Sequence, residues 1–82
     1  MSAKDNREFA AFGRRIIRAH ARRIAESDPA ALGDLLELRR AVDTALDEAV
    51  VGLRGAGFSW GEIGREVGMT RQAAQQRWGR AS

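Results

Sequence analysis

Apolar residues recur every three or four positions through the first half of the chain, which is the period of an amphipathic helix. Between about residues 4 and 26, one side is mostly aromatic and branched: Phe9, Phe12, Ile16, Ile17, His20 and Ile24. The opposite side is basic: Arg7, Arg14, Arg15, Arg18 and Arg22. The pattern predicts one long amphipathic helix, which Gly13 weakens slightly.

A second long helix is predicted to follow and to continue to about Arg54. Asp28 before Pro29 is a favourable start, because an acid can cap the helix and proline fits its first position. Asp34 with Glu37 three residues later offers an alternative start that resembles a capping box. The apolar stripe consists of Leu32, Leu35, Leu38, Val42, Leu46, Ala49, Val50 and Leu53. The sequence "RGAG" then ends the helix, because glycine adopts the left-handed C-terminal cap.

The next stretch, "FSWGEIGREVGMTRQAAQQRWGR", predicts two short helices. Ser59 with Glu62 forms a Ser-x-x-Glu capping box for the first, which runs to about Val67. Gly68 breaks that helix, and Thr70 caps a second one that ends at about Trp78. Two short helices joined by a three-residue turn with glycine are typical of a helix-turn-helix. No strand pattern is visible, so the predicted fold is all-α, with two long N-terminal helices supporting a C-terminal helix-turn-helix.

The chain has 82 residues, so one compact domain is expected, with a core that is marginal by itself. Within it, residues 1–28 are predicted to form a basic helix for dimerisation or docking. Residues 29–82 are predicted to hold the supporting helix and the helix-turn-helix. Cysteine is absent and the single histidine is His20, so neither a disulfide framework nor a metal site is expected.

Charge is distributed in three blocks. Residues 1–25 hold seven Lys or Arg and two acids, residues 26–53 hold two and seven, and residues 54–82 hold five and two. The acidic middle can pair with the basic first block, which leaves the C-terminal basic face for an anionic partner.

Within the two short helices, small and apolar residues stand where two helices must cross closely. Gly64 and Ala74 are the small positions, Gly68 is the turn glycine, and Thr70 is the capping hydroxyl. The apolar positions are Phe58, Ile63, Val67, Met69, Ala74 and Trp78.

The stretch "GFSWGEIGREVGMTRQAAQQRWGRA" resembles the helix-turn-helix of bacterial sigma factor region 4 and related small regulators. The pattern there is G-[YF]-S-x-x-E-I-A followed by L-G-[IV]-[ST]-R, and the resemblance covers about residues 35–80. Gly64 stands where alanine is usual, and Ala74 where valine is usual. The resemblance implies DNA binding and does not extend to promoter recognition by polymerase.

The candidate DNA contacts lie mainly on the second short helix, whose N-terminal part enters the major groove in this motif. The base-contact candidates are Arg71, Gln72, Ala73, Gln75 and Gln76. Gln72 and Gln76 can recognise adenine through paired hydrogen bonds, Ala73 can touch a thymine methyl group, and Arg71 can reach guanine or phosphate. The phosphate-contact candidates are Ser59, Trp60, Thr70, Arg77 and Arg80.

Other residues keep two interpretations. Trp60 fits a packing or rim position as well as a phosphate contact, and Trp78 fits the core. His20 fits a buried or interface histidine better than a ligand. The arginines of the first helix fit a solvated or acid-paired face and a second DNA surface equally well.

We therefore expect a DNA-binding protein, either a small transcriptional regulator or a nucleoid-associated protein, in the cytoplasm at the nucleoid. Double-stranded DNA and a second copy of the chain are the expected partners, with no membrane, small-molecule ligand, cofactor or metal. No catalytic arrangement is visible, so no enzyme activity is expected. The alternative is an adaptor that docks on RNA polymerase or a regulator without recognising DNA; such an adaptor would be expected to lack the exposed glutamine and arginine face.

Overall fold

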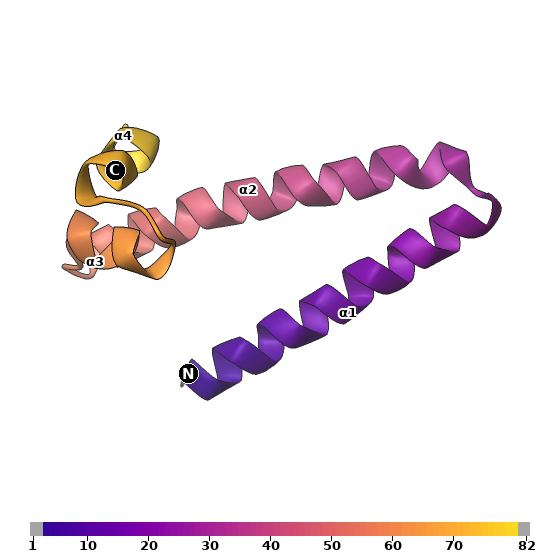
Figure 1. Ribbon diagram of the computed structural model, residues 1–82, viewed down its shortest axis with the longest axis horizontal. Helices are drawn as coiled ribbons and strands as arrows, with labels where there is room; N and C mark the ends of the chain where they lie inside the picture. The colour runs from indigo at the N-terminus through magenta and orange to yellow at the C-terminus, as the bar shows by residue number, and fades with distance from the viewer. Residues whose placement is uncertain (1–2, 81–82) are drawn as a thin grey trace. The chain divides into compact units, whose positions relative to one another are not determined.

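The computed structural model describes residues 3–80, and all regular secondary structure in that range is helical, which confirms the predicted all-α class. In chain order the elements are α1 (Ala3–Ser27), the 3₁₀ turn η1 (Pro29–Ala31), α2 (Leu32–Gly55), α3 (Trp60–Glu66) and α4 (Arg71–Trp78). Figure 1 shows the two long helices in indigo to pink and the two short ones in orange and yellow.

The chain divides into two compact units, one up to Arg39 and one from Arg40 onward, and the boundary lies within α2. The first unit holds α1, η1 and the start of α2. The second holds the rest of α2 together with α3 and α4, and it contains the candidate DNA-contacting residues.

In the first unit, α1 forms as the apolar period predicts, but most of its apolar face is open. Ile24 is buried, whereas Phe9, Phe12 and Ile16 are each more than half exposed. An amphipathic helix gains most of its stability from packing of its apolar face. The stripe of α1 is therefore a surface that the first unit leaves available for contact.

The predicted start at Asp28 and Pro29 is right in position, because Pro29 is the first residue of η1, but the predicted side-chain cap is wrong. Asp28 precedes η1, not an α-helix, and its carboxylate makes no capping hydrogen bond. Its own N–H donates to the Ile24 carbonyl (2.9 Å), so the residue after α1 is held by a hydrogen bond to the last turn of that helix. Its ψ of 70° departs from the extended backbone of a cap residue, which is why the side chain does not reach the following amides. The alternative start at Asp34 does not form either, because Asp34 already lies inside the first turn of α2.

In the second unit, α2 ends in a Schellman motif. The Phe58 N–H donates to the Leu53 carbonyl and the Gly57 N–H donates to the Arg54 carbonyl, both at 3.0 Å. Gly57 has a φ of +100°, a conformation that side chains other than glycine rarely adopt. The predicted end of the helix at "RGAG" is thereby confirmed.

The end of α3 repeats the same geometry. The Met69 N–H donates to the Gly64 carbonyl at 2.8 Å, and Gly68 supplies the positive φ of +71°. Because this turn folds back tightly, an added Cβ on Gly64 would lie 2.6 Å from the Met69 carbonyl oxygen. The predicted need for a small residue at position 64 is confirmed, and the backbone of the turn is what imposes it.

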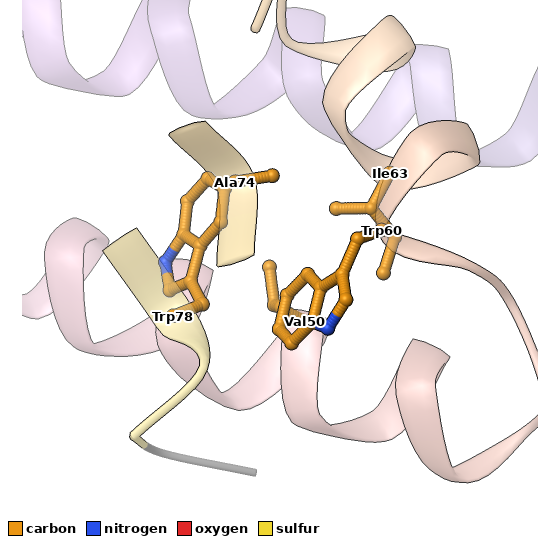
Figure 2. Packing of buried hydrophobic residues seen from close by; sticks show 5 residues of the cluster. All are labelled: Val50, Trp60, Ile63, Ala74 and Trp78. Atoms are coloured by element: carbon orange, nitrogen blue, oxygen red, sulfur yellow. The ribbon is translucent and has the colours of Figure 1, made fainter. Parts of the chain in front are cut away.

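The core of the second unit is built around two tryptophans. Figure 2 shows the five buried side chains that converge there: Val50, Trp60, Ile63, Ala74 and Trp78. Met69 packs against them and is partly buried. The core position of Trp78 is confirmed. Phe58 and Val67, which the sequence places among the apolar positions, are each more than two-fifths exposed, and Trp60 occupies the core with Ile63.

The close approach at Gly64 predicts that Gly64→Ala destabilises the protein. Alanine is the better helix former, but the turn backbone has to move, so we expect a net loss of about 1 to 2 kcal/mol in the free energy of unfolding. Gly61→Ala in the same helix is the matched control, because its Cβ would meet only the Ser59 hydroxyl at 3.7 Å. It should stabilise by up to about 0.5 kcal/mol, because Gly61 lies in the first turn, where the helix preference for alanine is weaker than in the middle. Urea unfolding followed by circular dichroism measures both, and equal effects of the two variants would contradict the steric argument.

Candidate nucleic-acid interface

One face of α4 is buried and the other is polar and exposed. Ala74 is completely buried and Trp78 is 5% exposed, so these two side chains attach the helix to the core. Gln72, Gln75 and Gln76 are exposed, which is the arrangement that the sequence predicts. Ala73 lies between the two faces and is half-buried. The three amides therefore form a continuous row that contributes nothing to the core.

The N-terminus of α4 is capped by Thr70, as predicted. The Thr70 hydroxyl oxygen accepts a hydrogen bond from the Ala73 N–H at 3.1 Å. The first turn of α4 contains no acidic residue. Exposed Arg71 adds a positive charge where the helix dipole is already positive. This end of α4 is therefore suited to an anion such as a DNA phosphate.

The N-terminus of α3 differs, because its capping box is complete. The Ser59 hydroxyl oxygen accepts from the Glu62 N–H at 3.1 Å, and the Ser59 N–H donates to the Glu62 carboxylate at 3.0 Å. The hydrogen bonds from Ser59, first from its backbone N–H, hold the pKa of Glu62 below its ordinary value. An ionised carboxylate thus occupies the Ser59 N–H that a phosphate would use, and the Ser59 hydroxyl also interacts with that carboxylate.

Trp60 is 9% exposed and belongs to the core cluster, which confirms the packing interpretation. Arg54 covers its ring, with the guanidinium carbon 4.7 Å from the ring centroid. The same guanidinium donates to the Phe58 carbonyl at 3.0 Å. Arg54 therefore joins the end of α2 to the start of α3, a role that no local sequence signal indicated.

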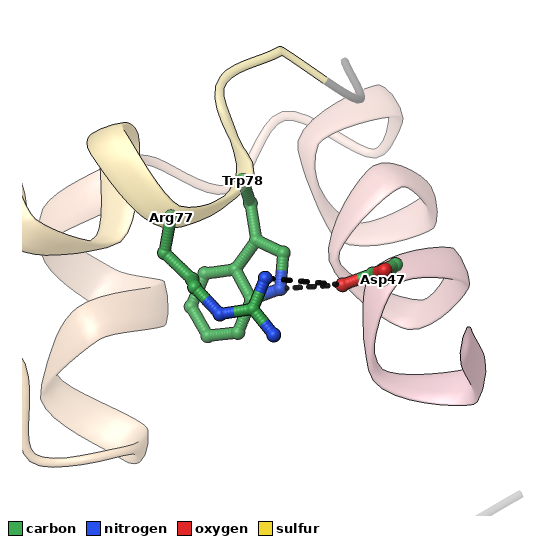
Figure 3. Close-up of polar contacts among 3 residues, drawn as sticks. All are labelled: Asp47, Arg77 and Trp78. Carbon is green, nitrogen blue, oxygen red and sulfur yellow. Dashed lines mark hydrogen bonds and ion pairs between the residues drawn. The ribbon is translucent and has the colours of Figure 1, made fainter. Parts of the chain in front are cut away.

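At the end of α4, Arg77 is engaged within the protein. Its guanidinium lies 3.8 Å from a carboxylate oxygen of Asp47 on α2, and its side chain is half exposed. The same oxygen accepts a hydrogen bond from the Trp78 indole N–H at 3.0 Å (Figure 3). Arg80 is exposed just beyond the helix. Sequence analysis did not single out Asp47, which lies 31 residues before Trp78 in the chain.

The second unit thus brings together an exposed glutamine row, an open helix N-terminus and flanking arginines, all on or next to α4. No group of three or more potential metal-ligating side chains occurs within residues 3–80. Nor does any helix in that range combine the length and apolar character required to cross a membrane. No known protein family, curated protein or solved structure matches the chain.

The capping box predicts a pH dependence of stability. Because folding lowers the pKa of Glu62, its charge stabilises the native state above the ordinary carboxyl value of 4.5, and this contribution disappears as the pH falls through the lowered pKa. Glu62→Gln keeps a hydrogen-bond acceptor but removes the charge, so the wild type should melt at a higher temperature at pH 7 and lose that advantage in acid. Thermal melts between pH 7 and pH 3 measure the difference.

Glu66→Gln is the control for this prediction, because Glu66 lies in the last turn of the same helix. A carboxylate there is disfavoured by the helix dipole, so its removal should leave the melting temperature unchanged or slightly raised at neutral pH. A constant difference between wild type and Glu62→Gln at every pH would show that the charge of Glu62 is not involved.

Proposed function

We propose that the protein binds double-stranded DNA in the major groove through a helix-turn-helix formed by α3, the turn at Gly68 and α4. The observation that carries this proposal is the exposed row of Gln72, Gln75 and Gln76 on a helix whose opposite face is buried. Glutamine amides form paired hydrogen bonds with adenine, and a helix anchored on one face can present them to base edges.

The other side chains of α4 fit roles around this row. Ala73 is small enough to let the helix approach a thymine methyl group, and Arg71 can reach guanine or a phosphate from the first turn. Thr70 and Arg80 are the phosphate contacts that the local geometry supports best. Thr70 caps a helix end without competing acid, and Arg80 is exposed. Ser59, Trp60 and Arg77 were also predicted from sequence as phosphate contacts, but each makes internal contacts, so the proposed phosphate contacts do not include them.

The resemblance of residues 35–80 to sigma factor region 4 and related regulators supports the same proposal. The capping box at Ser59, the turn glycine Gly68 and the cap at Thr70 are the positions of that pattern that the structure forms. We infer a small transcriptional regulator or nucleoid-associated protein, acting in the cytoplasm at the nucleoid, with no catalytic role and no cofactor.

We further propose that the protein acts as a homodimer. One short recognition helix provides few base contacts, whereas a dimer can span two half-sites about one helical turn apart. The exposed apolar stripe of α1, centred on Phe9, Phe12 and Ile16, is the proposed dimer surface.

Fluorescence-anisotropy titration of the full chain against a pool of random duplexes, at two salt concentrations, tests the DNA-binding proposal. We expect salt-sensitive binding and, after selection and sequencing of the bound DNA, an enriched motif that contains adenine. On a selected site, Gln72→Ala or Gln76→Ala should cost about 1 to 3 kcal/mol and have little effect on random DNA.

Arg80→Ala is the control for the glutamine variants, because loss of a phosphate contact should weaken binding to both DNAs equally. Equal losses of Gln72→Ala or Gln76→Ala on selected and random duplexes would refute base recognition. Absence of binding at low salt would overturn the DNA proposal and favour a protein adaptor.

Sedimentation equilibrium tests the homodimer. We expect Phe12→Ser to weaken association by about 1.5 to 3 kcal/mol, because about half of each side chain is available for burial and it is lost from both sides of a symmetric interface. Arg18→Ser, on the basic side of the same helix, should leave association unchanged. A wild-type chain that stays monomeric at high concentration, or equal effects of the two variants, would contradict an interface on the apolar stripe.

A further inference from the structure

A single carboxylate oxygen of Asp47 interacts with two consecutive residues at the end of α4. It accepts a hydrogen bond from the Trp78 indole at 3.0 Å, and it lies 3.8 Å from the guanidinium of Arg77. The guanidinium carbon of Arg77 is in turn 5.5 Å from the centroid of the Trp78 ring. Figure 3 shows the two nitrogen-bearing groups pointing at the same oxygen.

These two interactions have different strengths and consequences. The Trp78 ring is buried, so its N–H needs an acceptor, and losing that acceptor would leave a buried donor unsatisfied. Arg77 is half exposed, and an ion pair in that setting contributes little to stability. The hydrogen bond therefore fixes the carboxylate in place, and its negative charge is held beside Arg77 as a consequence.

Arg77 is also one of the guanidinium groups that flank the glutamine row. A DNA phosphate near this end of α4 would have to compete with Asp47 for it. Phosphate contacts strengthen binding to every sequence alike, so an arginine that is withheld from phosphates lowers non-specific affinity more than it lowers discrimination between sequences.

We propose that Asp47 is a specificity-determining residue of the DNA-binding surface, which anchors α4 through Trp78 and withholds Arg77 from the phosphate backbone. The inference rests on the proposed DNA-binding function. It assigns two tasks to the Asp47 side chain. The carboxylate oxygen, as a hydrogen-bond acceptor, positions α4, and the negative charge limits non-specific attraction to DNA.

Asp47→Asn separates the two tasks, because an amide oxygen can still accept from Trp78 while the charge is gone. On random duplex DNA at low salt, we expect binding tighter by roughly two- to fivefold. The slope of log K against log salt should steepen by about one unit, since one more phosphate contact forms. A purely structural role of Asp47 would not steepen that slope.

Asp43→Asn is the matched control, because it removes the same charge from an exposed position one turn earlier on α2. It should change the affinity less and leave the slope unchanged. In the double variant Asp47→Asn with Arg77→Ala, the gain should vanish. The inference is overturned if Asp43→Asn has the same effect as Asp47→Asn, or if the gain survives without Arg77.

A variant that misfolds would be recognised from the indole N–H of Trp78, which is buried and which we expect to be protected from solvent exchange to the same degree in the wild type and in Asp47→Asn. If Asp47→Asn does misfold, the salt dependence of Arg77→Ala alone is measured instead. Since Arg77 is withheld in the wild type, this variant should leave the salt slope unchanged, and a slope shallower by one unit would overturn the inference. If the wild type binds DNA but the variants do not show these effects, only the role of Asp47 is refuted. If the wild type does not bind DNA, the proposed function is overturned as well.

Discussion

The packing of two indole rings around a fully buried alanine is the constraint on which the second unit depends. Ala74 has no exposed surface, and Trp60 and Trp78 lie in the same cluster with Val50 and Ile63. Each tryptophan buries a large apolar area, and the helices that carry them, α3 and α4, are each only about two turns long. Helices this short are not stable alone in water, so their conformation is maintained by this cluster and by their caps.

Because α3 and α4 depend on contacts with α2, part of the arginine content is used inside the protein. The sequence supplies a basic C-terminal block, but the structure divides its members between different tasks. All four of Arg54, Arg71, Arg77 and Arg80 are exposed, but Arg54 covers Trp60 and donates to a carbonyl, and Arg77 lies beside Asp47. Net charge therefore overstates the positive surface that a DNA molecule would meet, because part of it is used to fasten α3 and α4 to α2.

Local signals in the sequence were sufficient for the helix ends of the second unit. The Ser59–Glu62 box, the Thr70 cap and the turn at Gly68 depend on residues at most four or five positions apart, and each of these predictions is confirmed. The cap at Asp28 failed because it depends on how the preceding helix ends, and the carboxylate has no extended backbone from which to reach the next amides. A residue type that favours a cap therefore forms one only where its backbone is extended, as at Ser59 and Thr70.

The parts of the site that could not be predicted are those that join distant positions. Nothing in the spacing of Asp47 and Trp78 indicates that they meet, since the contact follows from how α4 packs on α2. Periodicity likewise identified the apolar side of α1 but could not say that Phe9 and Phe12 would stay exposed within the first unit. A hydrophobic period shows that a surface needs a partner, and only the packed structure shows whether the chain itself supplies one. In α4 the chain covers one side with Ala74 and Trp78, and the uncovered side carries amides that can hydrogen-bond equally well to water or to a base edge.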